Sequence, residues 1–420
     1  MDARELAARP DLNQYETLAN DLVSACNSGD PGALKRINEY RQLDRPVTPD
    51  ELRVLAHQRL RKLTGSECDG DELSVADARL LVAHLHGFES WDRFARFIED
   101  VNREESLASQ FEAAADAVVA GDLATLESML RANPDLVRAR SARLHESTLL
   151  HYVSANGVED FRQKSPENSV DVLKLLLRFG AEVDAENNPG RGTTLGLVAT
   201  SIHPAHAGVQ IPLLEALLDA GASVDGVPGG WIPLNAALHN GRPEAAHFLA
   251  ARGARLDLEG AAGVGRVDLV KSFFNDDGSL KATATKEQLE SGFMWACEYG
   301  HTAVVEFLLD RGFDLSTVSH GMPGLHWAII GGRIDTIKLL LDRGAPLELE
   351  NVYGGNVIGS ATWAVHWGDP VYRWPDPDTD WLAIVKLFID AGAKVHEIDT
   401  DFPTGNESVD ELLRRHGMTG

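Results

Sequence analysis

The chain has 420 residues, of which 44% are hydrophobic and 25% are charged, a composition that is ordinary for a globular protein in water. Its 64 acidic and 39 basic residues give a formal net charge of −25 at pH 7. Such a surface repels phosphate backbones and anionic lipid heads, so the charge argues against nucleic-acid and membrane partners.

Helix-start signals recur through the first hundred residues. The stretch TPDE at 48–51 combines a hydroxyl N-cap, a first-turn proline and a third-position glutamate. Ser74 with Asp77 opens the next predicted helix, and Ser90 precedes the amphipathic stretch WDRFARFIEDV. We therefore expect four or five helices over residues 1–105, forming a domain that caps the remainder of the chain or, alternatively, binds a partner.

Farther along the chain, a leucine-rich amphipathic stretch recurs, each time followed by glycine and a short apolar-acidic segment. Examples are LLLRFGAEVD, LLDAGASVDG, FLLDRGFDLS and LLLDRGAPLELEN. Glycine is favoured directly after a helix because the left-handed backbone at this position strains a residue that has a Cβ. Six glycines therefore predict six helix ends: Gly180, Gly221, Gly253, Gly312, Gly344 and Gly392.

The intervals between these glycines point to a family. The distances from Gly221 to Gly253 and from Gly312 to Gly344 are both 32 residues. A period near 33 that holds two antiparallel helices and a loop is typical of ankyrin repeats, and the chain resembles that family over residues 106–398. The resemblance implies an all-α solenoid of about eight repeats, each burying its apolar face against its neighbours.

Both ends of this array are expected to be capped. SVDELLRRHG, within residues 399–420, predicts a closing helix. Before the array, LSVADARLLVAHLHGFESWDRFARFIED resembles a helical segment that precedes the repeats in bacterial ankyrin-repeat proteins. The expected domains are thus a helical region at 1–105, the array at 106–398 and a cap at 399–420.

Two histidines match a family position. Ankyrin repeats open their first helix with Thr-Pro-Leu-His, and the resemblance implies that this histidine hydrogen-bonds the threonine and the neighbouring loop. His326 in PGLHWA and His151 in STLLHYV occupy the position, and Thr148 keeps the threonine. We expect both histidines to satisfy buried backbone groups. Trp327, the next residue, is expected to face the concave side where ankyrin proteins hold partners.

Repeats two, three and eight carry extra residues between their helices, namely SANGVEDFRQKSPENS, SIHPAHAGVQIP and HWGDPVYRWPDPDTD. Insertions along one edge of a repeat array often mark its binding face. Trp363, Trp367, Trp374 and Trp381 lie in or beside the third insertion. Tryptophan is typical of interface hot spots, but these side chains can equally form a small core that fixes the loop.

The leading functional prediction is a non-catalytic scaffold that binds a protein or peptide on its concave face and at its insertions. The net charge predicts a basic or neutral partner. The candidate binding residues come from the inner helices, hairpin tips and insertions: Tyr152, Asn156, His203, His206, Trp231, His239, Asn240, Glu298, Tyr299, Trp327, Trp363, His366 and Trp367.

The alternative is a small-molecule-binding protein or an enzyme, with a polar pocket under the insertions of repeats two and three. Its liners would be His151, Tyr152, His203, His206 and Gln210. Gly-x-Ser-x-Gly, His-Glu-x-x-His and phosphate-loop motifs do not occur in the sequence. The acidic run at 376–380 fails as a calcium loop because Trp381 stands where glycine is needed. We therefore predict no cofactor, no metal and no catalytic residue.

The cysteines and the N-terminus bear on location. Three cysteines occur and none forms a CxxC pair, so a zinc site or disulfide framework is not predicted. The first residues lack the apolar core of a signal peptide, and no run approaches eighteen apolar residues. The expected location is therefore the cytoplasm.

Overall fold

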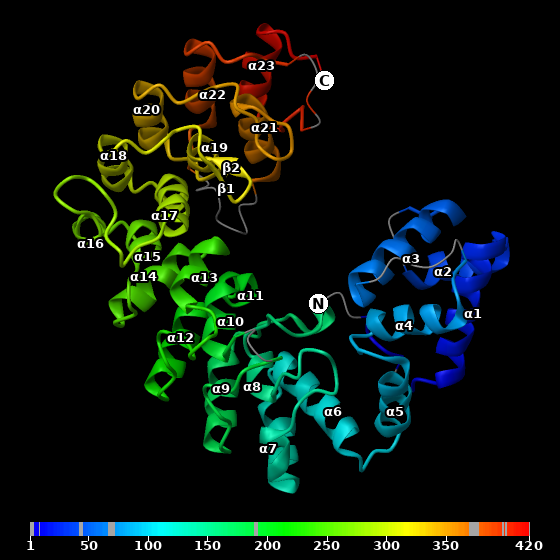
Figure 1. Cartoon of the computed structure of the whole chain (residues 1–420). Coiled ribbons are helices and arrows are strands. Elements are labelled where there is room, and N and C mark those ends of the chain that lie inside the picture. Colours follow the sequence, from blue (N-terminus) through cyan, green and yellow to red (C-terminus); the bar gives the residue numbers. More distant parts are fainter. Residues whose placement is uncertain are drawn as a thin grey trace. The chain divides into compact units, whose positions relative to one another are not determined.

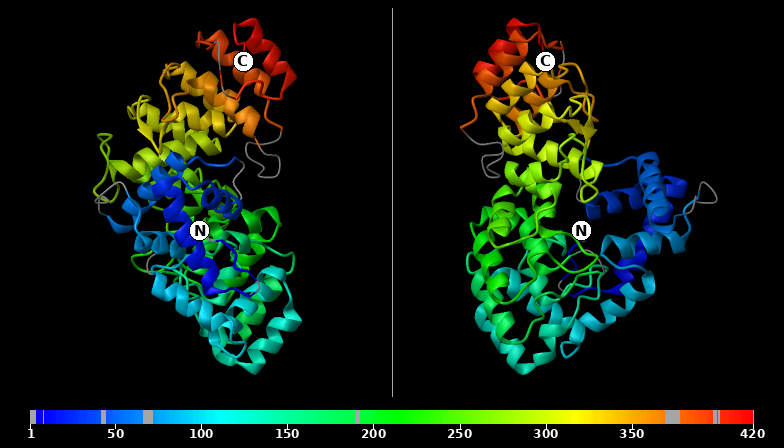
Figure 2. Two further views of the ribbon diagram at one scale, coloured as in Figure 1. Left: turned by 90° about the vertical axis from the view of Figure 1, so that its right-hand side faces the viewer. Right: turned by 60° about the vertical axis from the view of Figure 1, so that its left-hand side comes forward.

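A computed structural model of the chain describes residues 4–7, 9–41, 45–65, 72–188, 192–368, 378–396, 399 and 401–419 (Figure 1; Figure 2). Within these ranges the regular elements are α-helices, short 3-10 turns and one small antiparallel ribbon, which confirms the all-α fold class. No helix in the described ranges is long and apolar enough to cross a bilayer. Packing divides the chain into two compact units: Met1–Val198, Ala207–Ala222 and Val227–Gly230 form the first, and Ala199–His206, Ser223–Gly226 and Trp231–Gly420 form the second.

The first unit begins with five helices around a shared core. These are α1 (Leu12–Ser28), α2 (Pro31–Arg41), α3 (Pro49–Thr64), α4 (Val75–Leu85) and α5 (Trp91–Val101). The helix starts expected from the sequence are confirmed, because Thr48 and Ser74 form capping boxes and Ser90 accepts a bond from the third helical N–H of α5. Tyr15, Phe88 and Phe94 lie at the centre of the core.

The remainder of the first unit consists of paired helices. The elements are α6 (Leu107–Ala120), α7 (Leu123–Ala132), η1 (Pro134–Arg138), α8 (Leu149–Tyr152), η2 (Asp160–Arg162), α9 (Ser169–Arg178) and α12 (Gln210–Asp219). Between α9 and α12, α10 (Thr194–Thr200) and α11 (Ile202–His206) contain residues of the second unit. Helix α6 packs between α5 and α8, and α9 packs between α7 and α12, so the helical region continues directly into the paired helices.

The second unit holds five further pairs and a closing helix. The pairs are α13 (Pro233–His239) with α14 (Pro243–Ala251), α15 (Leu258–Gly263) with α16 (Val267–Ser272), α17 (Lys286–Tyr299) with α18 (Thr302–Asp310), α19 (Gly324–Ile330) with α20 (Ile334–Asp342), and α21 (Val357–Trp367) with α22 (Trp381–Asp390). Helix α23 (Glu407–Arg415) packs on α22. Helices α13, α15, α17, α19 and α21 pack side by side and form the first-helix row, while α16, α18, α20 and α22 form a second row (Figure 1).

All six glycines expected to end helices do so. Each directly follows a C-cap residue and has φ between +80° and +94°. The N–H of the residue after each glycine donates to a carbonyl five residues back, as at Ala345 and Leu340, which satisfies an otherwise unpaired helix end. The number of repeats and the domain boundaries expected from the sequence stay predictions.

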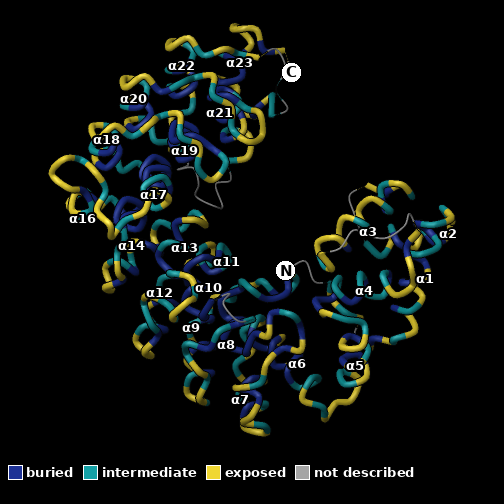
Figure 3. The backbone as a smooth tube through the Cα atoms, viewed as in Figure 1, coloured by how far each residue is buried: buried dark blue, intermediate teal, exposed yellow. Residues whose placement is uncertain are grey.

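Glycines also let the first-helix row pack closely. A Cβ on Gly263 of α15 would lie 2.4 Å from the side chain of Leu238, and one on Gly292 of α17 would lie 2.9 Å from Ala262 Cβ. Every residue of α17 from Ser291 to Tyr299 is buried, which Figure 3 shows along the helix. Helix α17 is therefore the buried centre of this row, and the first-row helices on either side bring residues that are distant in sequence into contact with it.

Candidate functional site

Exposed apolar side chains of the second unit gather at the first-helix row. Among the described residues of this unit, the exposed large hydrophobic side chains are Trp231, Val318, Val352, Tyr353, Trp363, Trp367 and Leu382. The first four lie in loops that lead into first-row helices, and the two tryptophans after them lie on α21. Only Leu382 lies on a helix of the second row. Exposed apolar residues that gather in this way mark interaction surfaces more often than scattered ones do.

A carboxylate joins three helices near the middle of this row. Glu259 of α15 is 9% exposed, and its Oε1 lies 2.5 Å from His239 Nε2 of α13. The indole N–H of Trp295 on α17 donates to the same oxygen at 2.9 Å. Because His239, Glu259 and Trp295 come from three successive helix pairs, the carboxylate holds their side chains in register.

A tight hairpin adds two more rings to this group. Strands β1 (Val318–Ser319) and β2 (Met322–Pro323) are joined by His320 and Gly321, with φ of 52° and 84°. Positive φ at both positions is typical of a two-residue type I′ turn. The His320 ring lies 4.7 Å from Trp295 and 4.9 Å from His239, measured between ring centroids. The hairpin thus folds back onto the helices.

The ring of Trp327 completes what we call the Glu259 cluster: His239, Glu259, Trp295, His320 and Trp327. Trp327 lies edge-on to Trp295 at 5.4 Å, and its indole N–H donates to Ser319 O at 3.2 Å. Its side chain is only partly buried, whereas Trp295 is 2% exposed. The cluster therefore presents His239, His320 and Trp327 at the surface, where the buried side chains of Glu259 and Trp295 support them.

The cluster suits binding better than catalysis. Ser291 Oγ lies 2.9 Å from His320 Nε2, within hydrogen-bond distance, and burial lowers the pKa of His320. A catalytic serine-histidine pair needs a third group that orients the histidine. Among the described residues no carboxylate hydrogen-bonds His320, while Glu259 is already shared by His239 and Trp295.

Two exposed tryptophans lie one helical turn apart on α21. Trp363 is 42% exposed and Trp367 is 60% exposed. The indole N–H of Trp367 donates to Asp401 Oδ1 at 2.8 Å, and the hydroxyl of Thr362 donates to Asp399 Oδ2 at 2.8 Å. His366 lies beside Trp367, with 4.9 Å between ring centroids. The third insertion, including Trp374, lies mostly outside the described residues.

Two expected binding residues of the second unit are buried instead. Glu298 is 3% exposed, and burial raises the pKa of its carboxyl to about 8. The hydroxyl of Tyr299 donates to the backbone carbonyl of Leu238 on α13. Both side chains therefore support the first-helix row from inside. Asn240 is exposed and donates to Ala236 O at 2.8 Å at the end of α13.

In the first unit, the insertion of repeat two is held by a buried ion network. Arg143 Nη1 lies 2.7 Å from both Glu112 Oε1 and Glu159 Oε1, and Arg162 Nη1 lies 2.7 Å from Glu112 Oε2. Burial alone would raise the pKa of Glu159, but the charges of Arg143, the neighbouring His145 and Arg162 outweigh it and hold this pKa below its usual range. The charges of Glu159 and Arg162 in the insertion are thus balanced within a network that includes Arg143 and Glu112.

Two residues that were expected to bind a ligand contact this network or lie beside it. Tyr152 is fully buried and its hydroxyl donates to Glu159 Oε1 at 3.3 Å, while Asn156 is half-buried in the adjoining turn. The guanidinium of Arg143 lies over the rings of Phe88 and Phe97, at 5.7 and 5.1 Å from their centroids. The insertion therefore ties the N-terminal helices to the paired helices of the first unit.

The two motif histidines are structural, as expected. His151 Nδ1 lies 2.9 Å from Thr148 Oγ1, and its Nε2 lies 2.9 Å from Ala185 O in the following loop. His326 Nε2 lies 2.9 Å from Leu349 O of the next loop, and its Nδ1 lies 2.7 Å from Ser360 Oγ. Burial lowers the pKa of both imidazoles to about 4, so they are neutral near pH 7.

The remaining expected liners do not share one unit. His203 and His206 lie on α11 in the second unit, and burial lowers the pKa of His203. Gln210 belongs to the first unit, where it is buried and donates to Val198 O at 2.9 Å.

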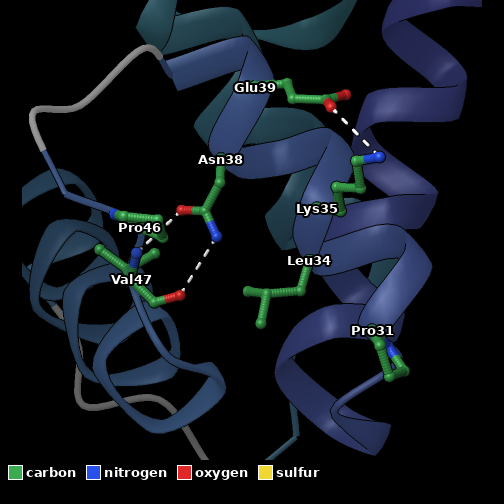
Figure 4. A pocket seen from close by; sticks show the side chains of 7 residues that line it. All are labelled: Pro31, Leu34, Lys35, Asn38, Glu39, Pro46 and Val47. Carbon is green, nitrogen blue, oxygen red and sulfur yellow. Dashed lines mark hydrogen bonds and ion pairs between the residues drawn. The ribbon is translucent and has the colours of Figure 1, made fainter.

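A pocket of about 490 Å³ lies between α2 and the segment before α3 (Figure 4). It is lined by Pro31, Leu34, Lys35, Asn38, Glu39, Pro46 and Val47, none of which was expected at a site. Asn38 exchanges hydrogen bonds with the backbone of Val47, and Lys35 pairs with Glu39 at 3.7 Å. The polar groups of the pocket are thus engaged with each other or with backbone, and they do not indicate a ligand.

Sequence reasoning missed the residues that organise the exposed surface. Glu259, His320, Asp399 and Asp401 were not expected at a site, because their partners lie 20 to 37 residues away in the sequence. Only the His320-Gly321 turn carried a local signal, since two residues of this kind between short apolar segments are typical of a hairpin.

Helix pairs that end in left-handed glycines and pack in rows define an α-helical repeat protein. The family model for ankyrin repeats, in three copies, matches residues 258–351, which span α15 to α20. Residues 258–351 are therefore similar to ankyrin repeats, as the resemblance predicted for this part of the chain. No curated protein matches the chain.

Proposed function

We propose that the chain is a non-catalytic protein-binding module, and that its second unit holds a protein or peptide on the first-helix row and the loops that lead into it. Ankyrin repeats are generally scaffolds for protein-protein interaction. The observation that carries the proposal concerns the exposed large apolar side chains in the described part of the second unit, all but one of which lie on this row or in the segments that lead into it.

The rigidity of these side chains supports the proposal. Tryptophan offers a large contact area with few rotatable bonds, so little entropy is lost when a partner covers it. Trp327 is fixed by Trp295 and by Ser319 O, and Trp367 is fixed by Asp401. A surface held in one geometry before binding loses less free energy on association than a mobile one.

The charge near this surface favours a basic or neutral partner. The segments 312–332 and 344–368 contain Asp314, Glu348 and Glu350 but no lysine or arginine. An acidic partner would meet like charge there, whereas a basic one is attracted in a salt-dependent way. The alternative, a small-molecule or catalytic pocket, has less support, because Glu159 and Arg162 of the first insertion are engaged in ion pairs.

Site-specific crosslinking tests the proposal. A photoreactive phenylalanine analogue is placed at Trp231, Tyr353 or Trp363, and at Leu382 as the matched exposed position on the second row. After illumination in an extract of the native cells, we expect crosslinked protein partners from the first three positions and none from Leu382. Equal crosslinking from all four positions, or from Leu382 alone, would show that the first-helix row is not the binding surface.

A further inference from the structure

The exposed tryptophans of α21 stand beside two carboxylates whose positions are fixed. We call Trp363, Trp367, Asp399 and Asp401 the α21 patch. Asp399 Oδ1 accepts from the backbone N–H of Asp401 at 2.9 Å, and its Oδ2 accepts from the Thr362 hydroxyl. Asp401 Oδ1 accepts from the Trp367 indole. The turn, the helix and the indole therefore hold both carboxylates in place.

The surroundings of these carboxylates within the described ranges are short of positive charge. Among the described residues, no lysine, arginine or histidine forms an ion pair with Asp399 or Asp401. Both are only partly exposed, and Nδ1 of His366 on α21 lies 3.3 Å from the backbone carbonyl oxygen of Pro403. The patch therefore combines exposed indoles with negative charge that the described residues leave unpaired.

A purely apolar partner fits this arrangement poorly. Covering both indoles would also remove the neighbouring carboxylates from water without giving them a counter-charge, which is costly. A cation on the partner solves this, because it neutralises the carboxylates and is attracted to the face of an indole, an interaction of about 0.5–2 kcal/mol. A guanidinium satisfies both demands, since its plane stacks on a ring while its edge donates to a carboxylate.

We propose that the α21 patch recognises an arginine or lysine side chain next to a large apolar residue in a peptide segment of the partner. This rests on the proposed function and names the chemistry that the second unit selects. The apolar residue packs on Trp363 or Trp367, while the basic group takes the charge of Asp399 and Asp401.

A peptide selection with a double-mutant cycle tests this proposal. Peptides that bind the full chain are selected from a random dodecapeptide phage library. The tightest-binding peptide is then synthesised in its original form and in variants in which glutamine replaces one basic residue. Affinities are measured for the wild type, Asp399→Asn/Asp401→Asn, and the control Asp335→Asn on α20, which pairs with Lys338 at 3.9 Å. Asparagine keeps an oxygen that accepts the Trp367 N–H, and circular dichroism checks that each variant is folded.

We expect selected peptides to contain arginine or lysine beside a large apolar residue. The double variant should bind such a peptide at least 10-fold more weakly, whereas Asp335→Asn should be unchanged. Replacing the basic residue should weaken binding to the wild type by a similar factor and have little further effect on the double variant. The inference would be overturned, and the proposed function left standing, if the selected peptides lacked basic residues. The same holds if the substitutions in the protein and in the peptide had independent effects on affinity. Failure to select any peptide would count against the proposed function as well.

Discussion

Two buried glutamates, Glu159 and Glu298, differ in protonation state because only Glu159 forms ion pairs with described residues. Glu159 lies in contact with two arginines and stays ionised, so its pKa is lowered despite complete burial. Glu298 is equally buried but has no ion pair, and one of its oxygens lacks a hydrogen-bond partner among the described residues. Burial raises its pKa to about 8, against the opposing charge of Arg333. Glu298 is therefore protonated at neutral pH.

Replacing Glu298 with glutamine should change how stability depends on pH. Below about pH 4.5 the carboxyl is protonated in both the folded and the unfolded state. Between about pH 4.5 and 8 the unfolded state releases a proton that the folded state keeps, so this group lowers the free energy of unfolding as pH rises. Glu298→Gln removes that loss, and the variant should gain ~1 kcal/mol over the wild type per pH unit in this window.

Denaturant unfolding of both proteins at pH 5, 6, 7 and 8 measures this gain. Taking the difference between variant and wild type cancels the buried histidines, such as His151 and His326, which titrate in both proteins. A constant difference across the four pH values would mean that Glu298 is already ionised in the folded state.

At the scale of elements, the first-helix row depends on contacts too close for side chains. Gly292 lies in the interior of α17, where an added Cβ would be 2.9 Å from Ala262 Cβ and 3.2 Å from Glu259 Cα. Neither atom can rotate away, because both belong to or adjoin the backbone of α15. Gly359 on α21 has more room, since the nearest atom to its added Cβ is Asp399 Oδ2 at 3.7 Å.

Alanine should therefore have opposite effects at these two helical glycines. Gly292→Ala should lower the free energy of unfolding by about 1–3 kcal/mol through overpacking against α15. Gly359→Ala should be neutral or raise it by up to about 1 kcal/mol, because alanine favours the helix. Urea unfolding measures both values. If Gly292→Ala were as stable as Gly359→Ala, α15 and α17 would be less closely packed than described.

The helix ends were predictable from the sequence, and the contacts between helices were not. Gly180 and the other five glycines each end the helical turn directly before them, so a short stretch of sequence is enough to predict each helix end. The contact of His151 with Thr148, and the contacts of His151 and His326 with the following loop, were predictable from the motif, whereas Ser360 as a partner of His326 was not. The Glu259 cluster and the Arg143 network join residues tens of positions apart, which only the tertiary fold brings together. Exposed Trp363 and Trp367 were expected at a site, whereas their carboxylate partners were not.

At the scale of a whole unit, one arginine joins parts that the sequence divides. Arg143 contacts Glu112 on α6 and Glu159 in the first insertion, and it lies over Phe88 and Phe97 of the N-terminal helices. All these residues belong to the first unit. The N-terminal helices and the paired helices after them should therefore lose their structure together.

Arg143→Leu tests this coupling, because it leaves two buried carboxylates with less positive charge. Loss of one partner of a buried ion pair costs about 3–5 kcal/mol. Hydrogen exchange should then accelerate both in α5 and at residues 159–162, while α17 and α19 stay protected. Arg131→Leu, which removes an exposed ion pair with Glu127, should have little effect. Faster exchange confined to residues 159–162 would contradict the coupling.

The Glu259 cluster sets a limit on how this gene can change by duplication. Gain or loss of one helix pair between α13 and α19 would preserve the glycine stops of the remaining pairs and most row contacts, so we expect the altered chain to fold. It would nevertheless insert or remove a pair between the carboxylate of α15 and the rings that meet it from either side. The array can therefore lengthen or shorten freely only outside this stretch, and within it the order of the helix pairs is fixed.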